Sequence, residues 1–464
     1  MSKYKAYPEY KDSGVEWLDC TPAHWSNAPI KYLALDTSSL FLDGDWIESK
    51  DISEEGIRYI TTGNVGEGCY KEQGSGFITE KTFSKLNCTE VFEGDVLISR
   101  LNNPIGRACL VPELGYKTVT SVDNVIFRTD KNYNRKYLVH LFSSKDYFQH
   151  TGNLARGTTM QRISRGLLGN IRIPLPTFLE QIAIAAFLDY ESAKIDNLIE
   201  KQQQLIELLK EKRQAVISHA VTKGLNPDVP MKDSGVEWLG EVPEHWDVVP
   251  LKYLCSFSGG GTPTKDNLAY WTNGSVPWVS PKDMKSFWIS ETQDYVTEKA
   301  VNESSTNYVE KDSLLLVVRS GILQRKIPVA INSVKVTMNQ DMKALKFNER
   351  MHVQYAVYFI SGNNNSLLFE WTKEGATVES IEHEYLANGL IPVPPIDEQI
   401  LIINNLSEKM KYFQLLEENA ASGIRLLQER RTSLISAAVT GKIDVRDWVA
   451  PDTSEVEESQ EATA

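Results

Sequence analysis

The sequence predicts a mixed α+β fold, with two α/β globular domains separated by two long helices that pair as an antiparallel coiled coil. Three observations support this fold class. A segment near the start of the chain recurs near its middle, two long helical runs have equal length, and short β-type runs bounded by Gly, Asn and Pro precede each long run. Together they indicate an internal tandem repeat with pseudo-twofold symmetry.

The repeated segments are residues 11–33 and 232–254, which are identical at 15 of 23 positions at an offset of 221. Each begins Lys-Asp-Ser-Gly-Val-Glu-Trp-Leu and continues to a His-Trp pair, His24-Trp25 or His245-Trp246. We interpret each pair as a structural Trp wedge with its neighbouring His. The offset falls only to 218 at the long helical runs, so each half of the chain is one complete module.

The divergent centres of the two modules, about 34–170 and 255–388, are expected to be the globular α/β domains. Their predicted strands are 57–61, 95–99, 314–318 and 327–331, and their predicted late helices are 137–148 and 352–360. A thin resemblance joins the centres: Tyr59-Ile60 aligns with Trp278-Val279 at offset 219. The remaining alignments, at offset 218, are Arg107 with Arg325, Asp123 with Asp341, Gly157 with Gly375, Thr159 with Thr377 and Ile163 with Ile381.

The long helices are predicted over 181–222 and 399–440, each entered through an Ile-Pro-x-Pro segment and a Glu-Gln pair. Each carries a narrow apolar seam at heptad spacing, which requires a partner helix. The cheapest partner for each helix is the other, and an antiparallel pair places the two repeat segments in equivalent environments; a parallel pair remains open. The predicted seam residues are Leu188, Ile195, Leu198, Leu205, Leu209 and Val216 in the first helix, and Leu406, Phe413, Leu416, Ala420, Leu427 and Leu434 in the second.

These features divide the chain into five predicted parts. The first globular domain is 1–170, including repeat segment 11–33, and the first spacer helix is 171–225. The second globular domain is 226–388, including repeat segment 232–254, and the second spacer helix with its C-terminal segment is 389–448. The acidic tail, 449–464, is expected to be disordered.

Composition excludes several functional classes. The seven His and five Cys have no metal-ligand spacing, so we expect no metal site. The chain shows no signal segment and no apolar run long enough for a membrane span, which favours a cytoplasmic protein. The Gly-rich stretch 258–265 lacks the spacing of a phosphate-binding loop, so we expect a flexible loop there, and no other catalytic motif is found. A net charge of −13 requires any nucleic-acid-binding surface to be local.

Polar clusters in the two centres are the candidate binding residues. Arg recognises guanine and Asn or Gln recognises adenine on major-groove base edges, while Lys, Ser and Thr bind phosphates. The aligned positions differ in chemistry, since Arg156 and Arg162 match Glu374 and Ser380, as expected of readers of two different sequences. Ordinary solvated loops are the alternative. The candidates are Arg100, Asn102, Asn103, Arg107, Arg156, Thr158, Gln161, Arg162, Arg165, Lys265, Lys282, Arg319, Gln324, Arg325 and Lys326.

A short motif, Gly-x-Thr-x-x-x-Ile, recurs just before each Ile-Pro-x-Pro segment, over 157–163 and 375–381. One interpretation is local turn and core chemistry at the entrance to the long helix. The other is a direct role at the ligand surface. The sequence favours the first and leaves the second open.

The ordered, duplicated set of motifs resembles the DNA specificity subunit of type I restriction-modification enzymes. The set comprises the Glu-Trp-Leu…Pro-x-His-Trp opening, the Ile-Pro-x-Pro…Glu-Gln entry to each long helix and the Ala-Val-Thr exit. The resemblance covers roughly residues 5–448. It implies two target recognition domains, each recognising one half of a split double-stranded DNA site, with paired helices that space them.

The resemblance also implies a non-catalytic subunit that binds two methyltransferase subunits, which restriction and translocase subunits join. S-adenosylmethionine, ATP and magnesium would then be used by those partners, and adenine methylation and ATP-dependent cleavage would be theirs. The alternative is a coiled-coil interaction scaffold that binds two partner copies and no DNA, because the same duplication and helices are consistent with it.

Overall fold

The structure is a computed structural model that describes residues 4–74, 76–101, 104–157, 160–372 and 380–450. The chain forms two compact units, and each is described separately. The first unit contains Met1–Gln202 and Ser422–Ala464, and the second contains Gln203–Ala421. Each unit therefore holds one repeat segment, one globular centre and about half of each long helix, whereas the sequence suggested that the helices were domains of their own.

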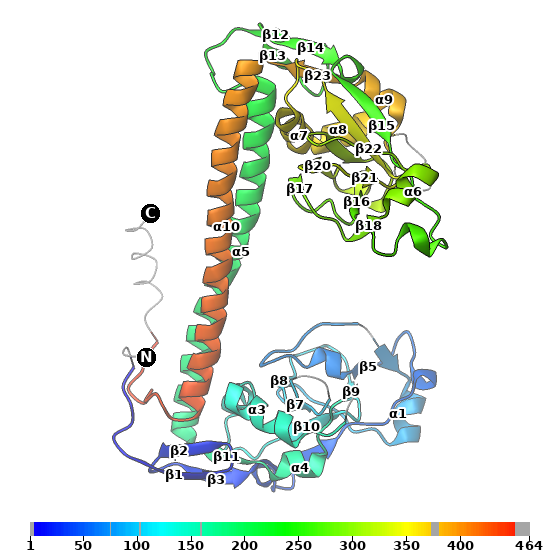
Figure 1. Ribbon diagram of the computed structural model, residues 1–464. Helices are drawn as coiled ribbons and strands as arrows, with labels where there is room; N and C mark the ends of the chain where they lie inside the picture. Colours follow the sequence, from blue (N-terminus) through cyan, green and yellow to red (C-terminus); the bar gives the residue numbers. More distant parts are fainter. Residues whose placement is uncertain (1–3, 75, 102–103, 158–159, 373–379, 451–464) are drawn as a thin grey trace. The chain divides into compact units, whose positions relative to one another are not determined.

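The globular centre of the first unit is built from two small sheets (Figure 1). One has the order β4-β10-β7-β8 and the other β6-β5-β9. The strands are β1 (Tyr10–Val15), β2 (Leu18–Pro22), β3 (Ser26–Pro29), β4 (Leu40–Asp43), β5 (Ile57–Ile60), β6 (Gly76–Ile78), β7 (Val96–Ser99), β8 (Ala108–Leu110), β9 (Thr118–Thr120), β10 (Asn124–Arg128) and β11 (Arg172–Leu175). The helices are α1 (Glu80–Leu86), α2 (Arg135–Leu141), α3 (Lys145–Leu154), α4 (Arg165–Asn170) and the first part of α5 (Phe178–Lys223), with 3₁₀ turns η1 (Ile30–Leu33), η2 (Ser49–Asp51) and η3 (Thr62–Asn64).

The single helix predicted over 137–148 is wrong, because the structure has α2 and α3 there, separated by a short break. Two adjacent serines explain the break. The Ser143 hydroxyl donates to the Val139 carbonyl oxygen at 2.8 Å and the Ser144 hydroxyl donates to that of Leu141 at 2.8 Å. Such side-chain bonds to the preceding turn compete with the backbone bonds that would continue the helix.

The second unit also has a larger and a smaller sheet, and its larger sheet has one more strand than that of the first unit. Its larger sheet has the order β15-β22-β19-β20-β17 and its smaller sheet the order β18-β16-β21. The strands are β12 (Met231–Asp233), β13 (Glu241–Pro243), β14 (Asp247–Pro250), β15 (Cys255–Gly259), β16 (Val276–Val279), β17 (Trp288–Ile289), β18 (Asp294–Val296), β19 (Leu314–Val317), β20 (Val329–Asn332), β21 (Thr337–Met338), β22 (Met342–Phe347) and β23 (Leu390–Val393). The helices are α6 (Glu298–Glu303), α7 (Val353–Gly362), α8 (Asn364–Trp371), α9 (His383–Asn388) and α10 (Ile396–Val439), with 3₁₀ turns η4 (Leu251–Tyr253), η5 (Leu268–Tyr270) and η6 (Gly321–Gln324).

Strand pairing places most of the aligned residues in matching positions. Tyr59 and Trp278 both lie on the central strand of a three-stranded sheet, which pairs in parallel with β9 in the first unit and with β21 in the second. The backbone oxygens of Asp123 and Asp341 accept hydrogen bonds from equivalent positions after β7 and β19. These pairings agree with the offsets of 219 and 218 in the sequence.

The alignment of Arg107 with Arg325 is wrong. In the β7–β8 hairpin, Ser99 donates its backbone N–H to the Arg107 carbonyl oxygen, and in the β19–β20 hairpin, Val317 donates to that of Pro328. The structural counterpart of Arg107 is therefore Pro328, because the second hairpin is three residues longer. Arg325 lies in this insertion, where η6 ends.

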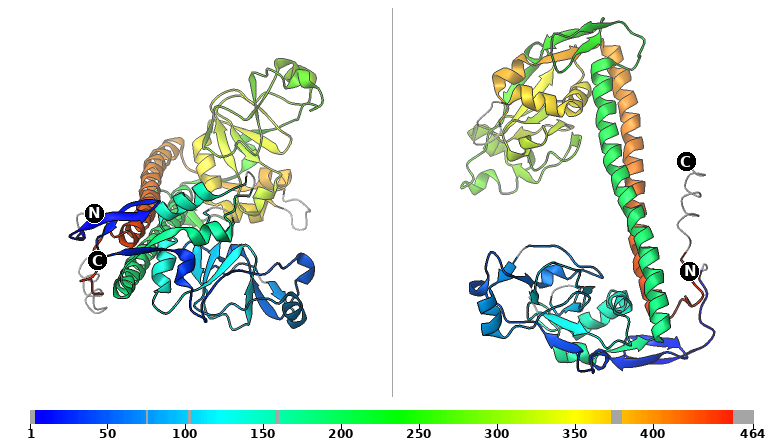
Figure 2. Two further views of the ribbon diagram at one scale, coloured as in Figure 1. Left: turned by 90° about the horizontal axis from the view of Figure 1, so that it is seen from below. Right: turned by 180° about the vertical axis from the view of Figure 1, so that it is seen from behind.

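Helices α5 and α10 lie side by side in each unit, as Figure 1 and both views in Figure 2 show. In the first unit the start of α5 packs in one apolar core with the end of α10, and Asp196 and Arg431 form an ion pair at 3.1 Å. In the second unit the end of α5 packs with the start of α10, and Arg213 and Glu417 pair at 3.0 Å. Within each unit the two helix segments therefore run antiparallel.

The buried face of α5 differs from the predicted seam at two positions. Leu198 and Leu205 are 41% and 42% exposed, whereas their neighbours Ile199 and Ile206 are partly buried. A heptad pattern assumes 3.5 residues per turn, whereas a straight α-helix has 3.6. The buried face therefore drifts along the sequence, and Ile199 lies on it in place of Leu198, as Ile206 does in place of Leu205. Of the other predicted seam residues, Leu188, Ile195, Leu209, Leu406, Phe413, Ala420 and Leu434 are buried, and Val216, Leu416 and Leu427 are partly buried.

Candidate nucleic-acid interface

A Glu-Gln pair at the start of each long helix fixes the globular centre to the helix. In the first unit the Gln181 side chain accepts the backbone N–H of Asn134 at 2.8 Å and donates to the Pro176 carbonyl oxygen at 3.0 Å. Gln399 makes the equivalent bonds to His352 and Pro394, both at 2.8 Å. Both glutamines are buried, so each is a polar link between the globular centre and the long helix.

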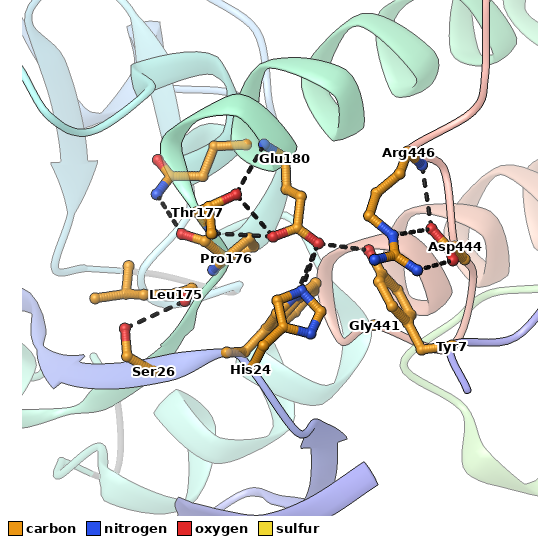
Figure 3. A network of polar contacts seen from close by, with 12 residues as sticks. Tyr7, His24, Ser26, Leu175, Pro176, Thr177, Glu180, Gly441, Asp444 and Arg446 are labelled. Atoms are coloured by element: carbon orange, nitrogen blue, oxygen red, sulfur yellow. Dashed lines mark hydrogen bonds and ion pairs between the residues drawn. The ribbon is translucent and has the colours of Figure 1, made fainter. Parts of the chain in front are cut away.

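The glutamates of the two pairs hold the repeat segments, which confirms the structural interpretation of the His-Trp pairs. Glu180 accepts a hydrogen bond from His24 at 2.8 Å (Figure 3). It also accepts one from the Trp25 indole at 3.4 Å. Glu398 accepts from His245 at 2.8 Å and from the Trp246 indole at 3.1 Å. The first network is larger, because Thr177 and Tyr7 also donate to Glu180, at 2.8 and 3.3 Å.

Glu180 carries a pH-dependent part of the stability. Burial would raise its pKa, but the bonds from His24, Thr177 and Trp25 outweigh burial and hold the pKa below its ordinary value. A carboxylate whose folded pKa is lowered stabilises the fold fully above its unfolded pKa, about 4.3, and loses this contribution as pH falls through the folded pKa.

We expect Glu180→Gln to lower the free energy of unfolding by about 2 kcal/mol at neutral pH, since the bonds to a buried charge are lost. The difference from the native protein should shrink below about pH 4, where the carboxylate is protonated anyway. Urea unfolding between pH 3 and 7 measures it. Glu429→Gln, an exposed change on α10, is the control; equal losses in the two variants would contradict this role.

The candidate arginines of the first unit gather around the turn between β9 and β10. Arg162 forms an ion pair with Asp123 at 2.7 Å, and Arg100 pairs with Asp43 at 3.1 Å. Arg165 reaches the same Asp43 at 3.8 Å. Three arginines thus pair with two aspartates, Asp43 at the end of β4 and Asp123 just before β10.

Arg100 is buried and Arg107 is partly buried, and both side chains bond to the chain itself. Arg100 is 4% exposed and donates to the carbonyl oxygens of Ile163 and Val122. Arg107 donates to four carbonyl oxygens, those of Thr62, Val65, Leu101 and Pro104, at 2.7 to 3.2 Å. Burial lowers the pKa of both guanidinium groups. Their donors are used by the chain itself, so they position loops and are not available for base contacts.

The exposed candidates of the first unit are Arg156, Gln161 and Arg162, and Arg165 is half-buried. A pair of backbone hydrogen bonds joins Arg156 and Arg162, at 3.0 and 2.9 Å. Gly157 has φ +112°, and an added Cβ would meet the Met160 carbonyl oxygen at 2.4 Å, so position 157 requires glycine. Ile163 is fully buried, which favours turn and core chemistry for the Gly-x-Thr-x-x-x-Ile motif. Asn102, Asn103, Thr158 and Thr159 lie outside the described residues.

The candidates of the second unit are all exposed: Lys265, Lys282, Arg319, Gln324, Arg325 and Lys326. Within the part of the chain that the structure describes, their side chains have no hydrogen-bond or ion-pair partner. Lys265 and Lys282 line one pocket beside Asn339, at the turn between β21 and β22. The backbone N–H of Arg319 donates to the Asp341 carbonyl oxygen at the same turn.

Gln324, Arg325 and Lys326 form a separate group at the end of η6. Lys326 faces a groove of about 1190 Å³ whose other wall is the second-unit part of α5, including Lys210 and Gln214. Gln214 donates to the carbonyl oxygens of Ser361 and Gly362 at 2.6 Å, which ties α5 to the end of α7. The second unit therefore offers two separate cationic surfaces, one at the β21–β22 turn and one at η6.

The sequence did not reveal the two glutamine links or the pocket beside Asn339. The recurrence of the Glu-Gln pair at the start of both long helices was the one sequence signal that could have pointed to the glutamine links. The residues of the pocket come from segments up to 74 positions apart, from Lys265 to Asn339, so no local pattern could identify it. Among the described residues no group of His, Cys, Asp and Glu could hold a metal ion, and no helix of this part is long and apolar enough to cross a membrane.

Comparison with known proteins gives consistent results. The family model for the type I restriction modification DNA specificity domain matches residues 40–208 and 243–421. The Escherichia coli EcoR124I/EcoR124II specificity subunit is 37% identical over 201 residues, 43% of this chain and 47% of that protein. The chain thus matches about half the length of this relative. The MjaVIII specificity subunit of Methanocaldococcus jannaschii is 23% identical over 375 residues, 79% of this chain and 83% of that protein.

Two solved structures share the fold. A chain from a structural study of the assembly and conformational transition of the type I R-M system superposes with a TM-score of 0.67 at 16% identity, covering 91% of this chain and 99% of that one. The HsdS subunit from Thermoanaerobacter tengcongensis superposes with a TM-score of 0.54 at 16% identity, covering 91% of this chain and 98% of that one.

Proposed function

Because this chain belongs to the type I restriction-modification DNA specificity family, we propose that it is the non-catalytic specificity subunit of such a complex. Each unit recognises one half of a bipartite, asymmetric double-stranded DNA site. The observation that carries this proposal is that residues at equivalent backbone positions of the two units have different side chains. Arg162, for example, forms an isolated β-bridge with Leu101, just after β7. Ser380 forms the equivalent bridge with Arg319, just after β19.

Several such positions differ in chemistry while their backbone bonds stay the same. Leu101 and Arg319 occupy the same bridge position, but Leu101 is buried in the first unit and Arg319 is exposed in the second. A duplicated structural module has no reason to vary there, whereas two modules that recognise different base sequences must. This supports a tandem duplication whose two recognition surfaces have diverged.

We propose that α5 and α10 form an antiparallel coiled coil that spaces the two half-sites. The support is local: Asp196 pairs with Arg431 in the first unit, and Arg213 with Glu417 in the second. From the first pair to the second, the partner on α5 moves toward the C-terminus while the partner on α10 moves toward the N-terminus. One continuous pairing along both helices accounts for these contacts.

The same helices carry the proposed contacts with two methyltransferase subunits. Phe178, Leu179 and Ile182 at the start of α5 are 40–77% exposed. Ile396, Ile400 and Leu401 at the start of α10 are 40–61% exposed, and positions 178 and 182 match 396 and 400 at offset 218. Two similar apolar patches suit two copies of one partner. Methylation with S-adenosylmethionine, and cleavage with ATP and magnesium by restriction and translocase subunits, belong to those partners in this proposal.

Salt-dependent binding tests the DNA contact directly. We expect Arg325→Ala/Lys326→Ala to weaken binding of duplex DNA containing the site and to reduce the slope of log K against log [salt] by up to roughly 1.8, at about 0.9 per lost phosphate contact. Fluorescence anisotropy between 50 and 300 mM salt measures both. Lys409→Ala/Lys411→Ala removes the same charge from an exposed part of α10 and is the control.

Two results would oppose the proposal. The first is equal weakening by the two double variants, since this would place the effect in net charge rather than in the η6 surface. The second is no binding of duplex DNA at low salt by the native chain with its methyltransferase partners. That result favours the protein-interaction scaffold.

A further inference from the structure

The second unit contains a pocket of about 440 Å³ where its three-stranded sheet meets the Gly-rich segment. Backbone bonds fix this junction: Gly261 donates to the Met338 carbonyl oxygen at 2.8 Å, and Asn339 donates to that of Val279 at 2.9 Å. The volume is in the range of small-molecule sites and holds one nucleotide. The lining residues that concern us are Lys265, Trp271, Trp278, Lys282, Asp294 and Asn339.

Two tryptophans give the pocket its apolar surface. Their rings meet edge to face, with centroids 5.2 Å apart and planes at 87°. The Trp278 indole N–H donates to the Gly261 carbonyl oxygen at 3.1 Å, and that of Trp271 donates to Thr264 at 3.2 Å. Both N–H groups are used, and Trp278 is only 6% exposed, so the ring of the partly buried Trp271 is the main aromatic surface open to a ligand. Such a surface accepts the flat face of a nucleobase.

The remaining free groups of the pocket are charged. Asn339 is 7% exposed, and its amide is bonded to Asp341 through both its oxygen and its nitrogen. In contrast, the side chains of Lys265, Lys282 and Asp294 have no partner among the described residues. The pocket thus presents two ammonium groups, which bind phosphate, and one carboxylate, which accepts hydrogen bonds only.

We propose that this pocket binds a single unpaired nucleotide whose base carries an exocyclic amino group. The Trp271 and Trp278 rings contact the base, and the Asp294 carboxylate accepts a hydrogen bond from the amine. Lys265 and Lys282 bind the phosphate. Adenine, cytosine and guanine carry the required amine, and thymine does not. The nucleotide comes from one of two sources. It is either a nucleotide displaced from the bound duplex, which rests on the proposed DNA recognition, or a free nucleotide.

The first unit lacks these groups at the equivalent positions. Trp278 pairs with Asp294 across β16 and β18, whereas Tyr59 pairs with Gly76 across β5 and β6. Ser121 replaces Asn339, since it donates to the Ile60 carbonyl oxygen as Asn339 does to that of Val279. Among the described residues that pair with β5, the first unit has no carboxylate. The pocket is therefore a feature of the second unit and is not part of the framework that both units share.

Calorimetric titration of the full-length chain with four deoxynucleoside 5′-monophosphates tests the pocket. We expect dAMP, dCMP and dGMP to bind about tenfold more tightly than TMP, because thymine has no exocyclic amine to donate to the Asp294 carboxylate. Its one N–H, at N3, lies between two carbonyl oxygens that repel the carboxylate. Asp294→Asn should abolish this preference, and Trp271→Ala should weaken all four by about tenfold. Glu291→Gln removes an exposed carboxylate nearby, outside the pocket, and should change neither. A TMP affinity equal to the others in the native chain would overturn the proposal.

A second titration distinguishes the two sources. The probe is a duplex with the recognised site in which one nucleotide of the second unit's half-site faces an abasic position, so that its base is unpaired. Displacement from DNA predicts about tenfold tighter binding than the intact duplex, an increase that Trp271→Ala removes. Tight mononucleotide binding without this increase identifies a free nucleotide. If no mononucleotide binds and the unpaired base adds nothing, the pocket proposal is wrong, while undiminished binding of the intact duplex leaves DNA recognition in place.

Discussion

Exchange of residues 34–170 for the matching centre of another specificity subunit is expected to change one half of the recognised DNA site and leave the other unchanged. The reason is that the first unit encloses its own sheets and core, and the exchanged segment begins after η1 and ends before β11. Half-site recognition by the second unit depends on side chains from 203–421 alone in this account. Methylome sequencing of a host that carries the hybrid measures both halves at once.

The hybrid must keep the contacts that cross its junctions. Tyr137 donates its buried hydroxyl to the Pro174 and Val439 carbonyl oxygens, at 3.0 and 3.4 Å, and Asn134 donates its backbone N–H to Gln181. The native chain with Tyr137→Phe, which lacks the two hydroxyl bonds, is the control, because it weakens the junction without exchanging the globular centre. A half-site that changes in the hybrid but not in this variant is then due to the exchanged centre and not to a weakened junction. Change in both half-sites of a folded hybrid would contradict the modular account.

Lengthening both long helices is expected to lengthen the unread spacer between the half-sites. Four residues inserted after Gln202 in α5, with four before Ser422 in α10, preserve the local pairs Asp196–Arg431 and Arg213–Glu417. Four helical residues advance about 6 Å, and base pairs are about 3.4 Å apart, so the spacer should grow by roughly one to two base pairs. Insertion into α5 alone should abolish methylation, because the facing helix no longer matches in length.

The same methylome readout applies to the lengthened protein. Its half-site sequences should be those of the native protein, since no residue of either globular centre is changed. An unchanged spacer, in a variant that still methylates, would show that the helices do not set the distance. Seven-residue insertions in both helices give a second point and should lengthen the spacer by about three base pairs.

Much of the framework could be predicted because duplication is visible in the sequence itself. The repeat segments, the Pro-flanked helix entries and four of the aligned positions in the centres all have counterparts in the structure. The helix seam was less certain, because a heptad pattern and the 3.6-residue helix diverge within a few turns, and Leu198 and Leu205 proved exposed. A three-residue insertion in one hairpin was enough to misalign Arg107 with Arg325.

The candidate site could be predicted only in part. Arg100 and Arg162 look alike in the sequence, but one is buried against Asp43 and the other is exposed beside Asp123. Their difference depends on which carbonyl and carboxylate oxygens the fold brings near, and no local pattern encodes this. The same limit applies to Asp294, whose position across from Trp278 is a consequence of strand pairing.

Methylome sequencing of the host with and without the gene tests whether this chain selects a split DNA sequence for methylation. We expect an adenine-methylated motif of two unlike halves, separated by unspecified bases, that disappears when the gene is deleted and returns when it is restored. A methylome that is identical in the two strains, while the partner methyltransferase genes are expressed, would contradict it.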